Sequence, residues 1–246
     1  MDKNFHSPAR TAVIGATGGI GAAFVSQLAK NSNFEKIYAL ARSTFHSEHS
    51  NVSSQLLDFA SESSIETAAE QIRDDGPLDL IIVATGILHR GDEVQPEKSM
   101  ADIDAKTMAE VLAVNTIGPA LVAKHFLPLL RPKTRTVFAV LSARVGSIAD
   151  NRLGGWLAYR SSKAALNMTV KTLSVEHARK RPESLLVGLH PGTVATNLSE
   201  PFTGRVAEDK LFSPERAASQ LLDVIEHLPD DASGGFFAWD GKPIPF

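Results

Sequence analysis

Two residues have the types and the spacing needed for proton transfer: Tyr159 and Lys163, in the stretch Tyr159-Arg-Ser-Ser-Lys163. Helical residues four positions apart lie on one face, with about 5–6 Å between their Cβ atoms. A free tyrosine has a pKa of about 10, and a neighbouring ammonium stabilises the phenolate and lowers that pKa. The pair therefore has the chemistry of a general acid or base, although this spacing alone is common.

Asn115 lies on the apolar face of a helix expected over 107–130. A buried amide needs hydrogen-bond partners. Pro119, four residues later, has no N–H, so the helical hydrogen bond to the Asn115 carbonyl is missing. That carbonyl could hold an ordered water. The alternative is a kinked core helix in which the asparagine is satisfied by its neighbours.

A glycine-rich turn, Gly15-Ala-Thr-Gly-Gly19-Ile-Gly21, joins the first expected strand to the first expected helix. Gly15 permits a tight turn, Gly19 lets backbone approach a ligand, and Gly21 lets the helix pack on the strand. The free N–H groups of the helix then face an anion such as a pyrophosphate. The alternative is a glycine-rich turn without a ligand, but the strand–helix context favours a dinucleotide.

The end of the second expected strand carries Arg42 and Ser43 and has no acidic residue. An acid there would bond the ribose 2′-hydroxyl of NAD, whereas an arginine offers a planar set of donors to a 2′-phosphate. NADP(H) is therefore predicted in preference to NAD(H). A solvated surface arginine is the alternative.

Apolar strands and amphipathic helices alternate along the whole chain, which predicts an α/β fold. We expect a Rossmann-type doubly wound parallel sheet of about seven strands with helices on both faces, in a single domain over 1–246. Residues 1–9 are expected to form a loose N-terminal extension. The expected strands are 11–15, 36–41, one ending at 56–58, 78–84, 136–141, 185–189 and 235–239; the expected helices are 19–30, 61–73, 107–130, 156–179 and 214–228.

Composition excludes several classes of protein. The 246 residues hold 25 Lys and Arg, 28 Asp and Glu and no cysteine, with a net charge of −3. Disulfides, thiol nucleophiles and cysteine-bound zinc are thereby excluded, and the charge favours neither nucleic acid nor membrane as a partner. The polar N-terminus lacks a signal-peptide pattern, so we expect a cytoplasmic protein. Isolated histidines such as His89, His125 and His190 predict no metal site.

The order of these motifs resembles that of the short-chain dehydrogenases/reductases in their standard short form, over roughly 11–239. The matching motifs are the glycine turn, Asn115, a serine at the end of the fifth strand, Tyr159 with Lys163, and Pro191-Gly192. Stretches 142–147, 159–163, 190–194 and 234–241 are similar to the C-factor-like and carbonyl-reductase-like branch.

The resemblance implies roles for individual residues. Tyr159 would donate a proton to a substrate carbonyl, Lys163 would bind the nicotinamide ribose, and Asn115 would hold a water. The implied cofactor contacts are Gly15, Thr17, Gly18, Gly19, Ile20, Gly21, Arg42, Ser43, Asp58, Phe59, Ala84, Thr85, Gly86, Tyr159, Lys163, Pro191, Gly192, Val194 and Thr196.

The chain departs from the family pattern in two places. The usual Asn-Asn-Ala-Gly after the fourth strand is Val83-Ala-Thr-Gly86 here, and Ala143 stands where the catalytic serine usually falls. Ser142 is our candidate for that serine, with Ser147 in reserve. Because one residue along a strand reverses side-chain direction, Ser142 can serve only if the strand end bulges or turns.

The resemblance implies an NADPH-dependent oxidoreductase that transfers hydride between the nicotinamide and a carbonyl or secondary alcohol. The alternative is an NAD(P)-binding regulatory or signalling protein of C-factor type with little turnover. Residues 197–212 are expected to form a lid over the substrate. The family pattern also implies a homo-oligomer, a dimer or tetramer, formed through the two long helices.

Overall fold

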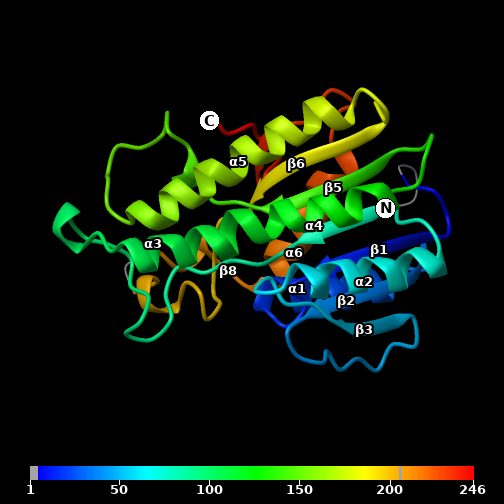
Figure 1. Cartoon of the computed structure of the whole chain (residues 1–246), viewed down its shortest axis with the longest axis horizontal. Coiled ribbons are helices and arrows are strands. Elements are labelled where there is room, and N and C mark those ends of the chain that lie inside the picture. Colours follow the sequence, from blue (N-terminus) through cyan, green and yellow to red (C-terminus); the bar gives the residue numbers. More distant parts are fainter. Residues whose placement is uncertain (1–4, 205–206) are drawn as a thin grey trace.

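The computed structural model describes residues 5–204 and 207–246, and it confirms a doubly wound parallel sheet (Figure 1). Seven parallel strands lie in the order β3-β2-β1-β4-β5-β6-β9. The strand order switches between β1 and β4: β2 and β3 are added on one side of β1, and β4, β5 and β6 on the other. Ligands bind at this switch point in such folds. The sheet strands are β1 (Ala9–Ile14), β2 (Phe34–Ala41), β3 (Val52–Leu56), β4 (Leu80–Val83), β5 (Thr136–Leu141), β6 (Ser184–His190) and β9 (Phe236–Ala238).

Helices cover both faces of the sheet. One apolar cluster joins the sheet to α1 and α6, and a second joins it to α2, α4 and α5. Figure 1 shows α2, α4 and α5 running side by side across the near face. The helices are α1 (Gly19–Lys30), α2 (Glu62–Asp75), α3 (Ala105–Leu112), α4 (Gly118–Phe126), α5 (Leu157–His177) and α6 (Pro214–His227).

The expected elements begin and end within two residues of the observed ones, and two regions differ from the expectation. Ala9, which we placed in a loose extension, is the first residue of β1 and is fully buried, because it pairs in register with Phe34. Phe5 also packs against Phe34, with ring centroids 6.2 Å apart, while residues 1–4 lie outside the described residues. A short pair of strands, β7 (Thr193–Val194) and β8 (Leu211–Phe212), is added within the segment that follows β6.

The expected helix over 107–130 is one helical run with a π-helical turn at Ala113–Ile117, where α3 passes into α4. Pro119 cannot donate a backbone hydrogen bond, so the regular helical pattern is interrupted there. The run Ala105–Leu129 is long and apolar enough to cross a membrane by length and composition alone, a test that core helices of soluble proteins also pass.

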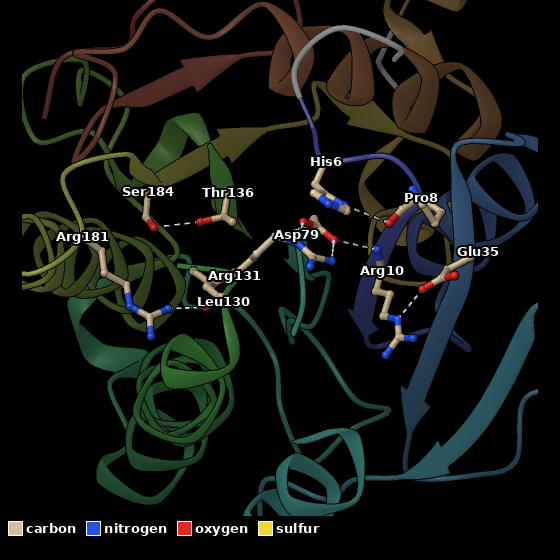
Figure 2. Close-up of polar contacts among 10 residues, drawn as sticks. All are labelled: His6, Pro8, Arg10, Glu35, Asp79, Leu130, Arg131, Thr136, Arg181 and Ser184. Atoms are coloured by element: carbon tan, nitrogen blue, oxygen red, sulfur yellow. Dashed lines mark hydrogen bonds and ion pairs between the residues drawn. The ribbon is translucent and has the colours of Figure 1, made fainter. Parts of the chain in front are cut away.

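A polar network ties together the amino ends of the central strands (Figure 2). Asp79 is fully buried and accepts hydrogen bonds from the Arg10 backbone N–H at 2.9 Å and from Arg131 Nε at 2.6 Å. Thr136 and Ser184 hydrogen-bond to each other across β5 and β6 at 2.8 Å. These contacts hold the edge of the sheet opposite to the one where the candidate site lies.

Candidate active site

The glycine turn lies at the carboxyl end of β1, as predicted. Gly15 has a φ of +88°, and a Cβ at Gly21 would lie 2.1 Å from the Gly15 carbonyl oxygen. No larger residue fits at Gly21 without moving backbone. Gly18 precedes α1 and provides no side-chain cap, so the N–H groups at this helix end are available to an anion.

The neighbouring strands bring the other expected nucleotide residues to the same edge. Arg42 and Ser43 directly follow β2 and are exposed, and Asp58, two residues after β3, is exposed as well. Phe59 is half-buried, and its ring occupies the space where a Cβ at Gly118 would lie, 2.0 Å from Phe59 Cδ2. Arg42 and Asp58 therefore face solvent, while Phe59 is held by the α4 helix.

The segment after β4 connects the nucleotide region to the catalytic residues. A Cβ at Gly15 would lie 2.9 Å from Thr85 Cγ2, so Thr85 covers the turn closely. The Thr85 hydroxyl is buried and has no hydrogen-bond partner among the described residues. A Cβ at Gly86 would lie 3.5 Å from both Asn115 Oδ1 and Lys163 Nζ. Gly15, Gly86 and the unpaired Thr85 hydroxyl therefore lie between the glycine turn and the catalytic residues, where a dinucleotide would bind.

Asn115 is fully buried in the π-helical turn, and its side chain is satisfied. Its Oδ1 accepts the Ile87 N–H at 2.8 Å, while its Nδ2 donates to the Ile87 carbonyl at 2.8 Å and to Ser162 Oγ at 3.0 Å. This amide ties the segment after β4 to α5. The role of its main-chain carbonyl toward a water stays a prediction.

Tyr159 and Lys163 lie one turn apart on α5 and are 9% and 3% exposed. Lys163 Nζ donates to the Leu141 carbonyl at 2.8 Å and lies 5.9 Å from the centre of the Tyr159 ring. Burial lowers the pKa of Lys163 to about 8, and burial also raises the pKa of Tyr159 above its ordinary value. Burial is the cause that shifts the Tyr159 pKa here, and it favours the protonated phenol.

Neither candidate serine directs its hydroxyl to Tyr159 through a hydrogen bond in the described structure. Ser142, at the end of β5, is buried and donates to Asn167 Oδ1 at 2.7 Å. Ser147 is buried and accepts the Asp150 N–H at 3.1 Å. Asn167 lies one turn of α5 beyond Lys163, so Ser142 reaches the catalytic helix but not its tyrosine.

The segment after β6 contacts the glycine turn. Gly192 has a φ of +80°, and a Cβ there would lie 2.8 Å from the Phe212 ring. Val194 is buried in β7, and Thr196 Cγ2 would lie 2.9 Å from a Cβ at Gly19. The segment that follows Pro191 therefore closes against the glycine turn.

Sequence reasoning missed the residues that line the entrance to Tyr159. The Trp156 ring lies 6.4 Å from Tyr159 and 5.0 Å from Phe202, and the His89 ring lies 5.7 Å from Phe202. These side chains come from three separate segments, and the sequence carries no spacing signal that joins them.

A parallel sheet with a glycine turn at its switch point and a buried tyrosine–lysine pair beside it defines a dinucleotide-dependent oxidoreductase site. The chain matches the model of the short chain dehydrogenase family over residues 10–206. It belongs to that family, in its C-factor-like and carbonyl-reductase-like branch.

Individual relatives span most of the chain. The C-signal of Myxococcus xanthus is 35% identical over 172 residues, covering 70% of this chain and 94% of the relative. An uncharacterized oxidoreductase of Schizosaccharomyces pombe is 29% identical and covers 95% of this chain and 96% of its own. The crystal structure of NADPH-bound carbonyl reductase from chicken fatty liver superposes with a TM-score of 0.84 at 28% identity, covering 97% of this chain and 94% of that one.

Proposed function

We propose that this protein is an NADPH-dependent reductase that converts a carbonyl to a secondary alcohol, with Tyr159 as the proton donor. The observation that carries the proposal is that Asn115 and Lys163 meet at Gly86, with Lys163 Nζ 5.9 Å from the centre of the Tyr159 ring. NADPH, when bound, supplies the hydride. The chain's own residues bind the nucleotide, orient the carbonyl and supply the proton.

The nucleotide would extend from the glycine turn past Thr85 and Gly86 to Lys163. The N–H groups at the start of α1 would bind the pyrophosphate, and Arg42 with Ser43 would bind the 2′-phosphate. Asp58 and Phe59 would contact the adenine. Ala84, Thr85 and Gly86 would lie beneath the nucleotide, and Lys163 would bind the nicotinamide ribose. On the nicotinamide side, the expected contacts are Pro191, Gly192, Val194 and Thr196.

Tyr159 would transfer its phenolic proton to the carbonyl oxygen. A tyrosine with its ordinary pKa of about 10 is protonated at neutral pH, and burial raises the pKa of Tyr159 further, so the phenol is in the form that donates. Lys163, whose pKa is lowered to about 8 by burial, is still largely protonated at neutral pH and would stabilise the phenolate left behind. Ser142 could assist the carbonyl only after releasing Asn167.

Residues 197–212 would form the substrate lid. His89 Nε2 lies 2.8 Å from the Asn197 carbonyl oxygen, and Leu198 lies 3.7 Å from the position of a Cβ at Gly86. Phe202 packs on Trp156, so the segment covers the catalytic pair. Residues 205–206 of the predicted lid lie outside the described residues.

The outward apolar residues on the long helices would support a homo-oligomer. Ile117, Met168 and Val175 are all more than half exposed, on the π turn and α5.

The decisive experiment replaces Tyr159 by phenylalanine and measures NADPH oxidation with a panel of aldehydes, ketones and quinones. Loss of the proton donor is expected to reduce turnover by about 10²–10⁴-fold. NADPH binding, measured by fluorescence titration, should stay within about twofold, because the ring keeps its place and loses only the hydroxyl. Retained turnover in Tyr159→Phe would overturn the proposed role.

A regulatory protein of C-factor type is the second candidate. It is favoured by the similarity to C-signal and by Ala143 at the family's serine position, with the Ser142 hydroxyl bound to Asn167. NADPH binding by the unmodified protein without oxidation across the whole panel would support this candidate over the reductase.

A further inference from the structure

The mechanism above does not use Glu97, a buried acidic residue in the segment between β4 and α3. Its relative exposure is 4%. Acidic side chains are rarely buried unless they are paired. No ion pair within the described ranges includes Glu97; instead, its two carboxylate oxygens accept the Ala158 N–H, at 3.2 and 3.1 Å. The carboxylate is therefore directed at the amino end of α5.

The amino end of α5 needs such an acceptor. The first N–H groups of a helix have no partner within the helix, and the preceding side chain usually supplies one. Here the preceding residue is Trp156, whose indole has no acceptor, and no side-chain cap is formed. Glu97 supplies two acceptors instead. Its carboxylate accepts the Ala158 N–H, and its main-chain carbonyl accepts the Trp156 N–H at 2.6 Å. Its negative charge is also favourable at this helix end.

Trp156 has a conformation that requires such support. Its φ of 54° and ψ of 44° are left-handed, a conformation that is unfavourable for a residue with a Cβ. In that conformation the indole stands edge-on to Tyr159 and to Phe202, at the entrance to the catalytic pair. Arg160 holds the preceding turn from another direction, since its Nε donates to the carbonyls of Gly154 and Gly155.

We propose that Glu97 is a positioning residue for the reaction: by capping α5 it holds Trp156 in its left-handed conformation and aligns Tyr159 with the substrate carbonyl. This inference rests on the proposed function, because it requires Tyr159 to act on a carbonyl. Glu97 acts through Ala158 and Trp156 and does not contact the reacting atoms. A substitution that removes the Glu97 carboxylate should therefore affect turnover more than cofactor binding.

The test compares Glu97→Ala, Glu97→Gln and Glu97→Asp in a Trp239→Phe background, where Trp156 is the only tryptophan. Because small displacements of a catalytic group are costly, Glu97→Ala should lower kcat by about tenfold or more. The Kd for NADPH should change by less than about twofold, because the interactions that bind the cofactor are unchanged. Glu97→Gln keeps an acceptor oxygen and should restore kcat to within about threefold of the parent. Tryptophan emission should shift in Glu97→Ala and not in Glu97→Gln.

Asp104→Ala is the matched control. Asp104 caps α3 by accepting the Thr107 N–H at 2.7 Å, and it is exposed. Removal of this cap should lower the melting temperature and leave kcat and tryptophan emission unchanged. Glu97→Asp covers the case in which Glu97→Ala does not fold, because it keeps the charge but withdraws the carboxylate by one methylene.

The outcomes separate this inference from the proposed function. If Tyr159→Phe abolishes turnover while folded Glu97→Ala or Glu97→Asp keeps parental kcat and emission, the positioning role is wrong. If Tyr159→Phe keeps full turnover, the proposed function fails. The proposal that Glu97 aligns Tyr159 for catalysis is then also wrong, even if the tryptophan emission shows that Glu97 holds Trp156 in place.

Discussion

The nucleotide region and the catalytic wall of this site are built in opposite ways. The nucleotide region comes mainly from one contiguous turn, in which Thr17, Gly18 and Gly19 are exposed and the backbone presents the donors. The catalytic wall is made of buried side chains, and its members Asn115 and Lys163 come from different helices.

The difference follows from what each region must do. Backbone N–H groups can approach an anion only where no Cβ intervenes, so the nucleotide region depends on small residues. A proton donor depends on neighbouring side chains that fix its position and shift its pKa, and these are supplied by the surrounding fold. Substitutions that add side-chain atoms should therefore impair the nucleotide region, and substitutions that remove side-chain atoms should impair the catalytic wall.

Gly21→Ala should have the largest effect within the nucleotide region. The new Cβ would lie 2.1 Å from the Gly15 carbonyl oxygen, and backbone would have to move. Such overpacking costs about 1–3 kcal/mol, and the displaced turn should weaken NADPH binding by about a hundredfold. Denaturant unfolding and fluorescence titration measure the two effects. Gly204→Ala is the control, because a Cβ there meets nothing within 4 Å.

Arg42→Ala tests the one nucleotide contact that depends on a side chain. Loss of a charged hydrogen bond to the 2′-phosphate should raise the KM for NADPH by about tenfold and leave the KM for NADH nearly unchanged. Steady-state kinetics with both cofactors would show the change. Arg73→Ala, an exposed arginine on α2, should change neither value. A parent protein that already prefers NADH tenfold would contradict the assignment.

Ser142→Ala distinguishes a hydroxyl that supports the fold from one that acts on substrate. Since this hydroxyl is bound to Asn167, its removal should cost about 1–2 kcal/mol of stability and less than about fivefold in kcat/KM. Ser147→Ala provides the parallel measurement at the other candidate. A hundredfold loss of kcat/KM at unchanged stability would show that Ser142 turns toward the substrate.

His190 extends the comparison from activity to the pH dependence of stability. It is the last residue of β6, and burial, followed by the charge of Arg144, lowers its pKa from 6.5 to about 4. Between these values the unfolded chain binds a proton that the folded protein does not. Stability should therefore rise with pH across this window, by up to about 3 kcal/mol, and level off above it.

Urea unfolding at a series of pH values would measure this slope. His190→Gln should flatten it, whereas His46→Gln, at an exposed position, should leave it in place. An unchanged slope in His190→Gln would assign the effect to other groups.

Most of the fold was predictable because the alternation of apolar strands and helices is a local pattern. The π-helical interruption near Asn115 followed from a single proline, since Pro119 lacks an N–H. The start of β1 was predicted two residues late, and the β7–β8 pair was missed, because short pairings depend on contacts between distant segments.

The site was predictable to a different degree in its two regions. The glycine turn could be located from spacing and context, and its observed φ at Gly15 agrees with that prediction. The sequence also placed Tyr159 and Lys163 on one helix face. It could not show that burial would raise the pKa of Tyr159 instead of the ammonium lowering it.

The sequence by itself determined the order of the elements, the glycine turn and the spacing of the tyrosine–lysine pair, because each of these depends on near neighbours in the chain. Only the tertiary structure decided that Ser142 turns to Asn167 and that Glu97 caps α5 beside Trp156. Those partners lie 25 and 61 residues apart in the chain. Such contacts depend on how the helices pack on the sheet, and no local pattern encodes them.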